Sequence, residues 1–376
     1  MSLSLLVAFP VAASPPAAAS FPPAASPSAA ASPLPAEMPP PYVTQWGSQG
    51  TTEGQLWGLR TLAADDSGHI YVAESTNKRI QIYDNAGRFL SMWGWGVDDG
   101  TDEFQVCTSD CQIGTSGGGD GQFSGPTGVA LDASGNVYVS EWTNQRIQKF
   151  SSSGTFLAAW GWGVDDGTAE YQICTGGCEA GISGSGDGQF NNAWGIAVDS
   201  GGNVYVAEYG NDRVQKFSST GTFLRKWGTF GSGAGEFSLP RGITVDASSN
   251  VYVVDMANER VQKFSSAGVY QTEWGSVGGA DGQFRAPFGV AVDSSGNVFV
   301  VDSQNDTIQK FSSTGTFLTK WGTAGSGDGE FENPLGVAVD PKGMVYVTDS
   351  SNYRIQKFGK IGLDFFIGDP ETPLDR

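Results

Sequence analysis

GIAVDSGGNVYVAEYGNDRVQKF, residues 195–217, is one of six copies of a single phrase in this chain of 376 residues. Copies at 128–150, 242–264, 289–311 and 336–358 align with it without gaps, and a weaker copy occupies 61–83. The aspartates that open the first turn of each copy are spaced by 67, 67, 47, 47 and 47 residues. A period of this length, with several short strands in each unit, is typical of a propeller or another closed array.

Each unit reads as four short strands. In the quoted copy the first two are GIAVD and NVYVA, joined by a Ser/Gly turn, and RVQKF and TFLRKWG supply the third and fourth. The 54 glycines and the 12% of aromatic residues, which supply turns and large apolar side chains, also favour an all-β protein. Six such units predict an all-β six-bladed propeller of four-stranded antiparallel blades, a ring that leaves only short, protected edges.

The two ends of the repeat region predict how the ring closes. The phrase YVTQWG at 42–47 matches the fourth-strand phrase FLSMWG at 89–94, whereas the residues after Phe358 lack a WG ending. We therefore expect the N-terminal strand to complete the last blade. This assigns one propeller domain to residues 41–367 and leaves 368–376 as a C-terminal tail.

The repeated unit resembles the NHL repeat, because it reads G-[VI]-A-V-D-x-x-G-N-V-Y-V-x-[DE]-x-x-N-x-R-[IV]-Q-K-F. The resemblance covers the chain from Tyr42 to about Ile367 and implies a six-bladed β-propeller. It implies less about function, since NHL propellers include RNA-binding and ubiquitin-ligase-associated domains, an amidating lyase and secreted bacterial proteins. A fold of this kind hosts many functions, so the function has to be argued from particular residues.

Residues 1–40 form a separate segment. MSLSLLVAFPVAA resembles the apolar part of a signal peptide, although it lacks the usual basic start, and a Pro/Ala/Ser-rich tract follows it. We expect this segment to be a signal and a disordered linker, which predicts a secreted or cell-surface protein. The apolar run is short and interrupted by Pro10, so we expect no membrane-spanning segment.

The charge balance narrows the class of partner. The formal net charge is −19, and the basic residues are scattered singly instead of forming a patch. Binding to nucleic acid needs concentrated positive charge, so we expect no nucleic-acid partner. Calcium, cationic peptides and neutral sugars remain compatible with this acidic composition.

One position in every repeat carries an acid, three residues before an asparagine. Two interpretations are open: a ring of carboxylates that holds Ca²⁺, or a network that joins the acid, the Asn-led turn and a following Arg. A feature present in every blade most simply serves every blade, so we favour the structural network. The six acids of this ring are Glu74, Glu141, Glu208, Asp255, Asp302 and Asp349.

Aromatic residues that depart from the repeat indicate a candidate binding face. In a four-stranded meander, the loop after strand two and the loop before the next strand one lie on the same side of the disc. These loops carry side chains that no other blade repeats, and such side chains on a rigid scaffold are typical of binding surfaces. Their alternative role is ordinary loop packing, above all for the two tryptophans in the long insertions. The candidate residues are Trp142, Trp194, Tyr209, Arg241, Met256, Phe288, Trp95 and Trp162.

The loops that enter blades two and three each carry a 20-residue insertion, and these insertions contain all four cysteines. A zinc site would require both loops to converge on one ion, with no His nearby. A disulfide within each loop needs no convergence, so we predict Cys107–Cys111 and Cys174–Cys178, with cross-loop pairing as the alternative.

Each insertion also contains an Asp-Asp-Gly turn, at residues 98–100 and 165–167. Such paired carboxylates could hold Ca²⁺, but the spacing of an EF-hand is missing and an Asx turn is the simpler interpretation. We therefore assign no metal site and no cofactor.

Catalysis has little support in the sequence. The one histidine, His69, falls in the turn between strands one and two, on the side of the disc opposite the insertions. A Ser-His-Asp hydrolase has no second histidine to draw on, so we assign no catalytic residue. The leading hypothesis is a non-catalytic extracellular binding or scaffold propeller that recognises a protein, peptide or glycan on the face carrying the two Cys-containing insertions. A purely structural or interaction module displayed on the Pro/Ala-rich segment is the second hypothesis. The alternative is a metal-dependent hydrolase or lyase of the six-bladed propeller type.

Overall fold

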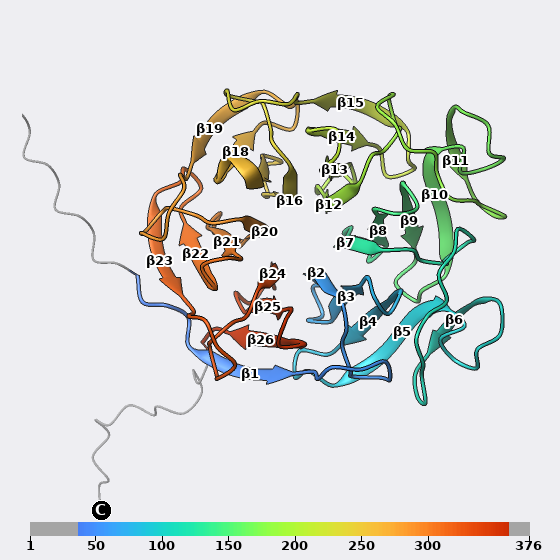
Figure 1. Cartoon of the computed structure of the whole chain (residues 1–376), viewed down its shortest axis with the longest axis horizontal. Coiled ribbons are helices and arrows are strands. Elements are labelled where there is room, and N and C mark those ends of the chain that lie inside the picture. The colour runs from blue at the N-terminus through green and yellow to red at the C-terminus, as the bar shows by residue number, and fades with distance from the viewer. Residues whose placement is uncertain (1–36, 361–376) are drawn as a thin grey trace, which may run out of the picture. The chain divides into compact units, whose positions relative to one another are not determined.

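A computed structural model describes residues 37–360, and these residues form six antiparallel β-sheets around a central axis (Figure 1). The signal-like segment, nearly all of the predicted linker and the C-terminal tail lie outside the described residues. Strand one of each blade is innermost, and the six inner strands are β2, β7, β12, β16, β20 and β24. The six-bladed propeller predicted from the repeat is therefore confirmed.

Blades one and two each contain five strands. Blade one consists of β2 (Leu59–Ala64), β3 (Ile70–Glu74), β4 (Arg79–Tyr83), β5 (Phe89–Trp95) and β6 (Phe104–Cys107). Blade two consists of β7 (Pro126–Leu131), β8 (Val137–Glu141), β9 (Arg146–Phe150), β10 (Phe156–Trp162) and β11 (Tyr171–Cys174).

The other four blades contain four strands each. Blade three consists of β12 (Ala193–Val198), β13 (Val204–Glu208), β14 (Arg213–Phe217) and β15 (Phe223–Trp227). Blade four consists of β16 (Pro240–Val245), β17 (Val251–Asp255), β18 (Arg260–Phe264) and β19 (Tyr270–Trp274). Blade five consists of β20 (Pro287–Val292), β21 (Val298–Asp302), β22 (Thr307–Phe311) and β23 (Phe317–Trp321). Blade six consists of β24 (Pro334–Val339), β25 (Val345–Asp349), β26 (Arg354–Phe358) and β1 (Tyr42–Trp46).

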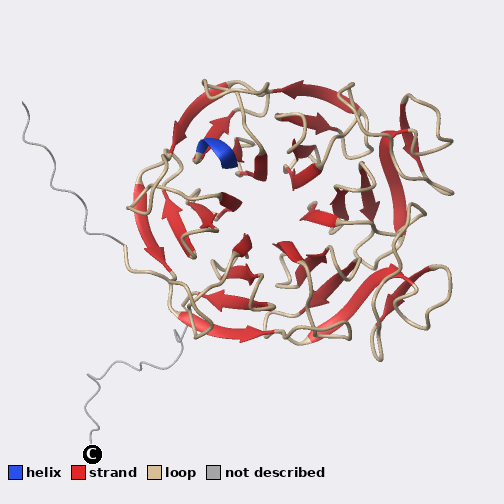
Figure 2. Cartoon of the chain, viewed as in Figure 1, coloured by secondary structure: helices blue, strands red, loops and turns tan. Residues whose placement is uncertain are grey.

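The ring closes as the sequence predicts. Strand β1 pairs antiparallel with β26, with Trp46 opposite Ile355, so the N-terminal strand is the outer strand of the last blade. Figure 2 shows that the only helical element in the described residues is a short 3-10 turn, η1 (Met256–Asn258). No helix within residues 37–360 is long and apolar enough to cross a membrane.

The repeated residues explain the local structure. In blade two, Asp132 accepts hydrogen bonds from the backbone N–H groups of Ser134 and Asn136, at 2.9 Å each, and from the Tyr138 hydroxyl at 2.9 Å. This network shapes the tight turn between strands one and two, where Gly135 has a φ of 76°. Strand two is buried along its whole length, because it lies in the middle of its sheet with a neighbouring blade on each side.

The glycine in strand one allows the inner strands to approach one another closely. A Cβ atom on Gly242 would lie 2.4 Å from the carbonyl oxygen of Phe288 in the next blade. The same position holds a glycine in blades two to six, and Thr61 replaces it in blade one. The glycine is therefore required by the close packing of strands around the channel.

The two insertions are where the fold departs from the prediction of four-stranded blades. Each insertion folds back on the strand it follows, so that Val106 pairs with Trp93 and Ile173 pairs with Trp160. Because this pairing supplies hydrogen bonds to an outer strand that would otherwise be an edge, it adds a fifth strand to blades one and two. The insertions thus extend the blades they leave, and each also packs one aromatic ring on the blade it enters, Phe104 on Phe150 and Tyr171 on Phe217.

Candidate ligand-binding face

Trp194 lies across the mouth of the central channel, at the face that carries the loops before strand one. It is the second residue of β12, and it is only 5% exposed. Its ring centroid lies 5.8 Å from that of Trp142, 6.4 Å from that of Tyr209 and 5.5 Å from that of Phe288. Arg60, Arg241 and Leu335 complete its surroundings, so all six blades contribute a side chain to this cluster.

Arg241 packs against three aromatic rings at this mouth. Its Cζ atom lies 3.9 Å from the centroid of Trp194, 4.2 Å from that of Tyr209 and 4.9 Å from that of Phe288. Contacts of this length are cation–π interactions. Burial, opposed by Tyr209 and reinforced by the charge of Arg60, lowers the pKa of Arg241 to about 10. The guanidinium therefore remains charged at neutral pH, but at a cost in desolvation.

A second arginine approaches the same tryptophan from blade one. The Cζ atom of Arg60 lies 5.4 Å from the centroid of Trp194, and its Nε donates a 3.0 Å hydrogen bond to Ser75 Oγ. Burial lowers the pKa of Arg60 as well. Neither Arg60 nor Arg241 forms an ion pair with any described carboxylate. The centre of this face therefore holds two partly buried positive charges without a compensating negative charge.

The predicted site residues differ in how accessible they are. Trp142 is 39% exposed, and Tyr209 and Met256 are half-buried. Trp194 and Phe288, which we expected to contact a ligand directly, are buried at the centre of the cluster. In the structure as it stands they are positioned to support Trp142, Tyr209 and Arg241 from below. Met256 begins η1 at the edge of this surface.

Two of the predicted site residues do not join the cluster. Trp95 and Trp162 lie on the outer strands β5 and β10, where they begin the insertions. Trp95 Nε1 donates to Asp102 at 2.7 Å, and Trp162 Nε1 donates to the backbone oxygen of Asp187 at 3.0 Å. These tryptophans pack against their own insertion loops, far from the axis, as Figure 1 shows for β6 and β11.

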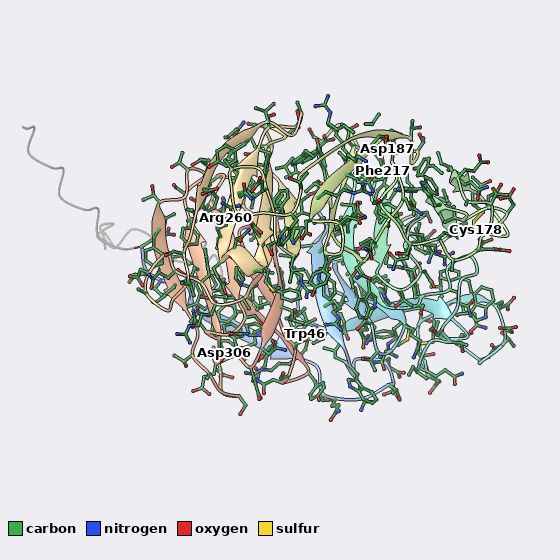
Figure 3. All side chains as sticks on the ribbon, turned by 45° about the horizontal axis from the view of Figure 1, so that its top comes forward. Trp46, Cys178, Asp187, Phe217, Arg260 and Asp306 are labelled. Carbon is green, nitrogen blue, oxygen red and sulfur yellow. A yellow bond between two sulfur atoms is a disulfide. The ribbon has the colours of Figure 1, made fainter. Side chains whose placement is uncertain are left out.

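The insertions are fastened to the propeller at several points. Disulfides join Cys107 to Cys111 and Cys174 to Cys178, and Figure 3 places Cys178 at the outer edge of the molecule. The second insertion is also held by the loop before β7, where Asp120 accepts hydrogen bonds from the N–H groups of Gly177 and Cys178, at 2.7 and 2.8 Å. The acid Asp120 and these cysteines lie close enough to resemble a metal cluster, but the disulfide removes both thiolates as ligands.

The Asp-Asp-Gly turns of the insertions are filled by hydrogen bonds. Asp99 accepts from the N–H and hydroxyl groups of Thr101, at 2.9 and 2.7 Å, and from Gln105 Nε2. These bonds lower the pKa of Asp99 to about 2. The equivalent Asp166 has the same partners in the second insertion and the same lowered pKa of about 2. Both carboxylates therefore organise an Asx turn.

The acid in each repeat has a full set of donors. In blade two, Glu141 accepts from Arg146 Nε at 2.8 Å, Gln148 Nε2 at 2.8 Å, Asn144 Nδ2 at 2.7 Å and the N–H of Ser124 at 2.8 Å. Arg146 in turn donates to backbone oxygens of the loop before strand one. A similar arrangement surrounds the other five acids, with two exceptions: Thr307 replaces the arginine in blade five, and Gln215 in blade three donates to the backbone oxygen of Gln189 and not to the acid. These five acids are Glu74, Glu208, Asp255, Asp302 and Asp349.

Behind Trp194 the channel is aliphatic. Its side chains come from strand one of each blade and are Leu, Val, Ile, Ala and Thr, with no imidazole or carboxylate among the described lining residues. His69 lies in the turn at the opposite face, where its Nδ1 is 2.9 Å from Asp65 Oδ2. The described residues that line the channel therefore offer no imidazole or carboxylate ligand to a catalytic metal.

The cluster could be found only in part from sequence. Trp142, Tyr209 and Arg241 break the repeat, and that signal identified them. Leu335 and Arg60 break it too, but their convergence on a tryptophan from blade three depends on the ring bringing strand one of every blade to the same axis.

Comparison with known proteins identifies the repeat. The model of the NHL repeat family matches residues 56–83, 123–150, 190–217 and 331–358. Among curated proteins, "Protein brain tumor" of Drosophila melanogaster is 28% identical over 145 residues, a match that covers 31% of this chain and 14% of that protein. The chain thus corresponds to a small part of that relative.

Two solved structures show the same fold. A protein of unknown function from Bacteroides thetaiotaomicron has a TM-score of 0.57 at 15% identity, over 84% of this chain and 76% of that one. Virginiamycin B lyase from Staphylococcus aureus has a TM-score of 0.51 at 11% identity, over 85% of this chain and 99% of that one. At these identities the likeness concerns the fold alone.

Proposed function

Since the chain is an NHL-repeat six-bladed β-propeller, we propose that it is a non-catalytic binding module whose ligand contacts the channel mouth around Trp142, Tyr209 and Arg241. The observation that carries this proposal is the convergence on one point of unrepeated aromatic and arginine side chains from blades one to five, with Leu335 from blade six. Aromatic and arginine residues are the ones that dominate binding energy at protein surfaces. The blades supply a rigid support for them.

The ligand class that this surface accommodates is a protein, peptide or glycan. The exposed part of Trp142 offers an apolar surface that can pack on a side chain or a sugar ring. We also propose a secreted or cell-surface location, which the two disulfides and the signal-like N-terminus support.

A metal-dependent hydrolase or lyase is the less supported alternative. Such a site needs imidazole or carboxylate ligands directed at one point in the channel, and the lining side chains are aliphatic. The acids of the repeat are already engaged by arginine, asparagine and glutamine side chains, with a threonine in place of the arginine in blade five.

Peptide and glycan arrays probed with the full chain test the proposal. A reproducible ligand is expected, and Trp142→Ala is expected to weaken its binding at least about tenfold, as for a residue central to an interface. Trp57→Ala is the matched control, because Trp57 is equally exposed, at 41%, but stands outside the cluster. Equal loss in both variants, or a ligand that is unaffected by Trp142→Ala, would remove the channel mouth as the binding surface.

A further inference from the structure

We infer that the channel mouth recognises a carboxylate of a protein or peptide partner, held between Arg60 and Arg241. This inference rests on the proposed binding function and specifies the chemistry of its ligand. The two guanidinium groups approach the same indole ring, with their Cζ atoms 5.4 and 3.9 Å from its centroid. The charge of Arg60 also acts on Arg241, whose pKa it helps to lower, so the two positive charges lie near each other at the axis.

The aromatic contacts leave one donor of Arg241 without a partner. Rings of Trp194, Tyr209 and Phe288 contact the guanidinium and hold it in place. Within the described residues, its Nε is buried and has no hydrogen-bond partner. A carboxylate binds a guanidinium edge to edge through two parallel hydrogen bonds, so a bound carboxylate would satisfy this donor.

The charge of the mouth also favours an anion. Six arginines between residues 37 and 360 form ion pairs: Arg79, Arg88, Arg146, Arg213, Arg260 and Arg354. Of those without an ion pair, Arg225 and Arg285 are exposed to solvent, whereas Arg60 and Arg241 are partly buried. A partly buried charge that is unpaired costs free energy, which binding of an anion would recover.

The net charge of −19 does not oppose such a ligand at short range. Salt screens exposed charges beyond about 8 Å at physiological ionic strength, so the two arginines dominate the field at the mouth. A polyanion would extend over the acidic surroundings and be repelled, whereas a single carboxylate would not.

Exposed apolar side chains on the same side of the disc, at the outer ends of their loops, favour a protein or peptide over a glycan. Phe230 is 75% exposed and Val277 is 69% exposed, and both lie in loops before strand one, on the same face as Trp142. A phenyl and an isopropyl group of this kind pack on apolar side chains and match the hydroxyl groups of a sugar poorly. The surface therefore combines apolar contacts with one point of carboxylate recognition.

Titration of the full chain with N-acetyl-phenylalanine, followed by tryptophan fluorescence and calorimetry, tests this inference. Saturable binding is expected. The corresponding amide lacks the negative charge, so its affinity is expected to be at least about tenfold lower. Arg241→Gln and Arg60→Gln are each expected to cause a loss of similar size. Arg285→Gln is the matched control, because this arginine is exposed and unpaired.

Inorganic phosphate and glucuronate are the competing probes. A phosphate affinity equal to that of N-acetyl-phenylalanine would overturn a peptide carboxylate as the ligand. Binding of glucuronate without binding of N-acetyl-phenylalanine would overturn it too. Absence of saturable binding to any probe would overturn it as well. Thermal unfolding of each variant accompanies the titration, and Arg241→Lys, which keeps the charge but not the paired donors, is used if Arg241→Gln does not fold.

The two proposals can fail separately. A ligand from the arrays that depends on Trp142 but not on Arg60 or Arg241 would overturn carboxylate recognition and leave the binding function intact. A carboxylate probe that binds equally well to the Arg variants and to the wild type would contradict the site itself.

Discussion

Replacing Glu141 by Gln is expected to destabilise the propeller by about 3 kcal/mol, because it leaves the guanidinium of Arg146 buried without its counter-ion. Both side chains are fully buried, and Arg146 Nε lies 2.8 Å from Glu141 Oε1. Removing one partner of a buried ion pair costs about 3–5 kcal/mol. We take the lower value, because Arg146 would still donate to backbone oxygens of Gly119, Gln122 and Glu179 at 2.8 Å.

Blade five supplies a natural control for this substitution. Asp302 occupies the equivalent buried position, but Thr307 stands where the arginine would be. Asp302 still accepts from Asn305 at 2.7 Å and from the N–H of Arg285 at 2.8 Å, and burial raises its pKa. Asp302→Asn loses acceptor capacity but also relieves an unpaired buried charge, so we expect a change within about 1 kcal/mol.

Thermal unfolding followed by circular dichroism compares the two variants. For a domain of this size, 1 kcal/mol corresponds to roughly 1.5 °C, so Glu141→Gln should lower the midpoint by about 4–5 °C and Asp302→Asn by under 2 °C. Equal shifts would refute the reasoning, because they would show that the arginine partner is irrelevant to the cost.

The pH dependence of Asp302→Asn gives a second check. The folded-state pKa of Asp302 is raised, so its charged form costs stability above that pKa, and the cost disappears as the pH falls below it. The free energy of unfolding of Asp302→Asn, relative to that of the wild type, should therefore be highest at neutral pH. It should fall in acid, where the wild type no longer carries the cost of the buried charge. A relative stability that does not change with pH would contradict the raised pKa.

Three further predictions concern other parts of the chain. Gly242→Ala should cost about 1–3 kcal/mol, since its Cβ would meet a backbone oxygen at 2.4 Å, whereas Gly176→Ala, where nothing lies within 4 Å, should leave the unfolding midpoint unchanged. Replacing Cys107 and Cys111 together by Ala should increase hydrogen exchange in the first insertion by an amount equivalent to about 2 kcal/mol. The ring should stay folded, because the insertion pairs only with the outer part of its blade. Global unfolding of the double variant would contradict this. The carboxyl carbon of Asp99 should titrate near pH 2 in NMR spectra, since hydrogen bonds stabilise its charged form, and an ordinary value near 4 would show that the turn is not formed in solution.

Sequence reasoning succeeded where the controlling interactions are local or repeated. All the partners of Asp132 in its turn lie within six positions of it, so this turn can be predicted from the sequence of any single repeat. The match of YVTQWG to the fourth-strand phrase predicted the pairing of β1 with β26, because each strand of the repeat has its own pattern.

It succeeded less well for the radial position of a side chain. The position of a residue in the repeat predicts its loop, and therefore the side of the disc on which it lies. This holds for Trp95, Trp162, Trp142 and Trp194. It did not tell their distance from the axis, since a loop before strand one runs from the outer strand of one blade to the inner strand of the next. Trp95 and Trp162 therefore lie at the rim, and Trp194 lies at the centre.

By itself, the sequence determined the number of blades, the order of strands within each blade and the closure of the ring, because each of these follows from a pattern of short range that recurs along the chain. Only the tertiary structure decided that Arg60 and Arg241, which are 181 positions apart, approach the same indole ring, that of Trp194, and that neither of them has a carboxylate partner. That contact depends on ring closure, which brings the first residues of distant inner strands to one axis. A repeat pattern specifies each blade, but the meeting of six blades is a property of the closed ring.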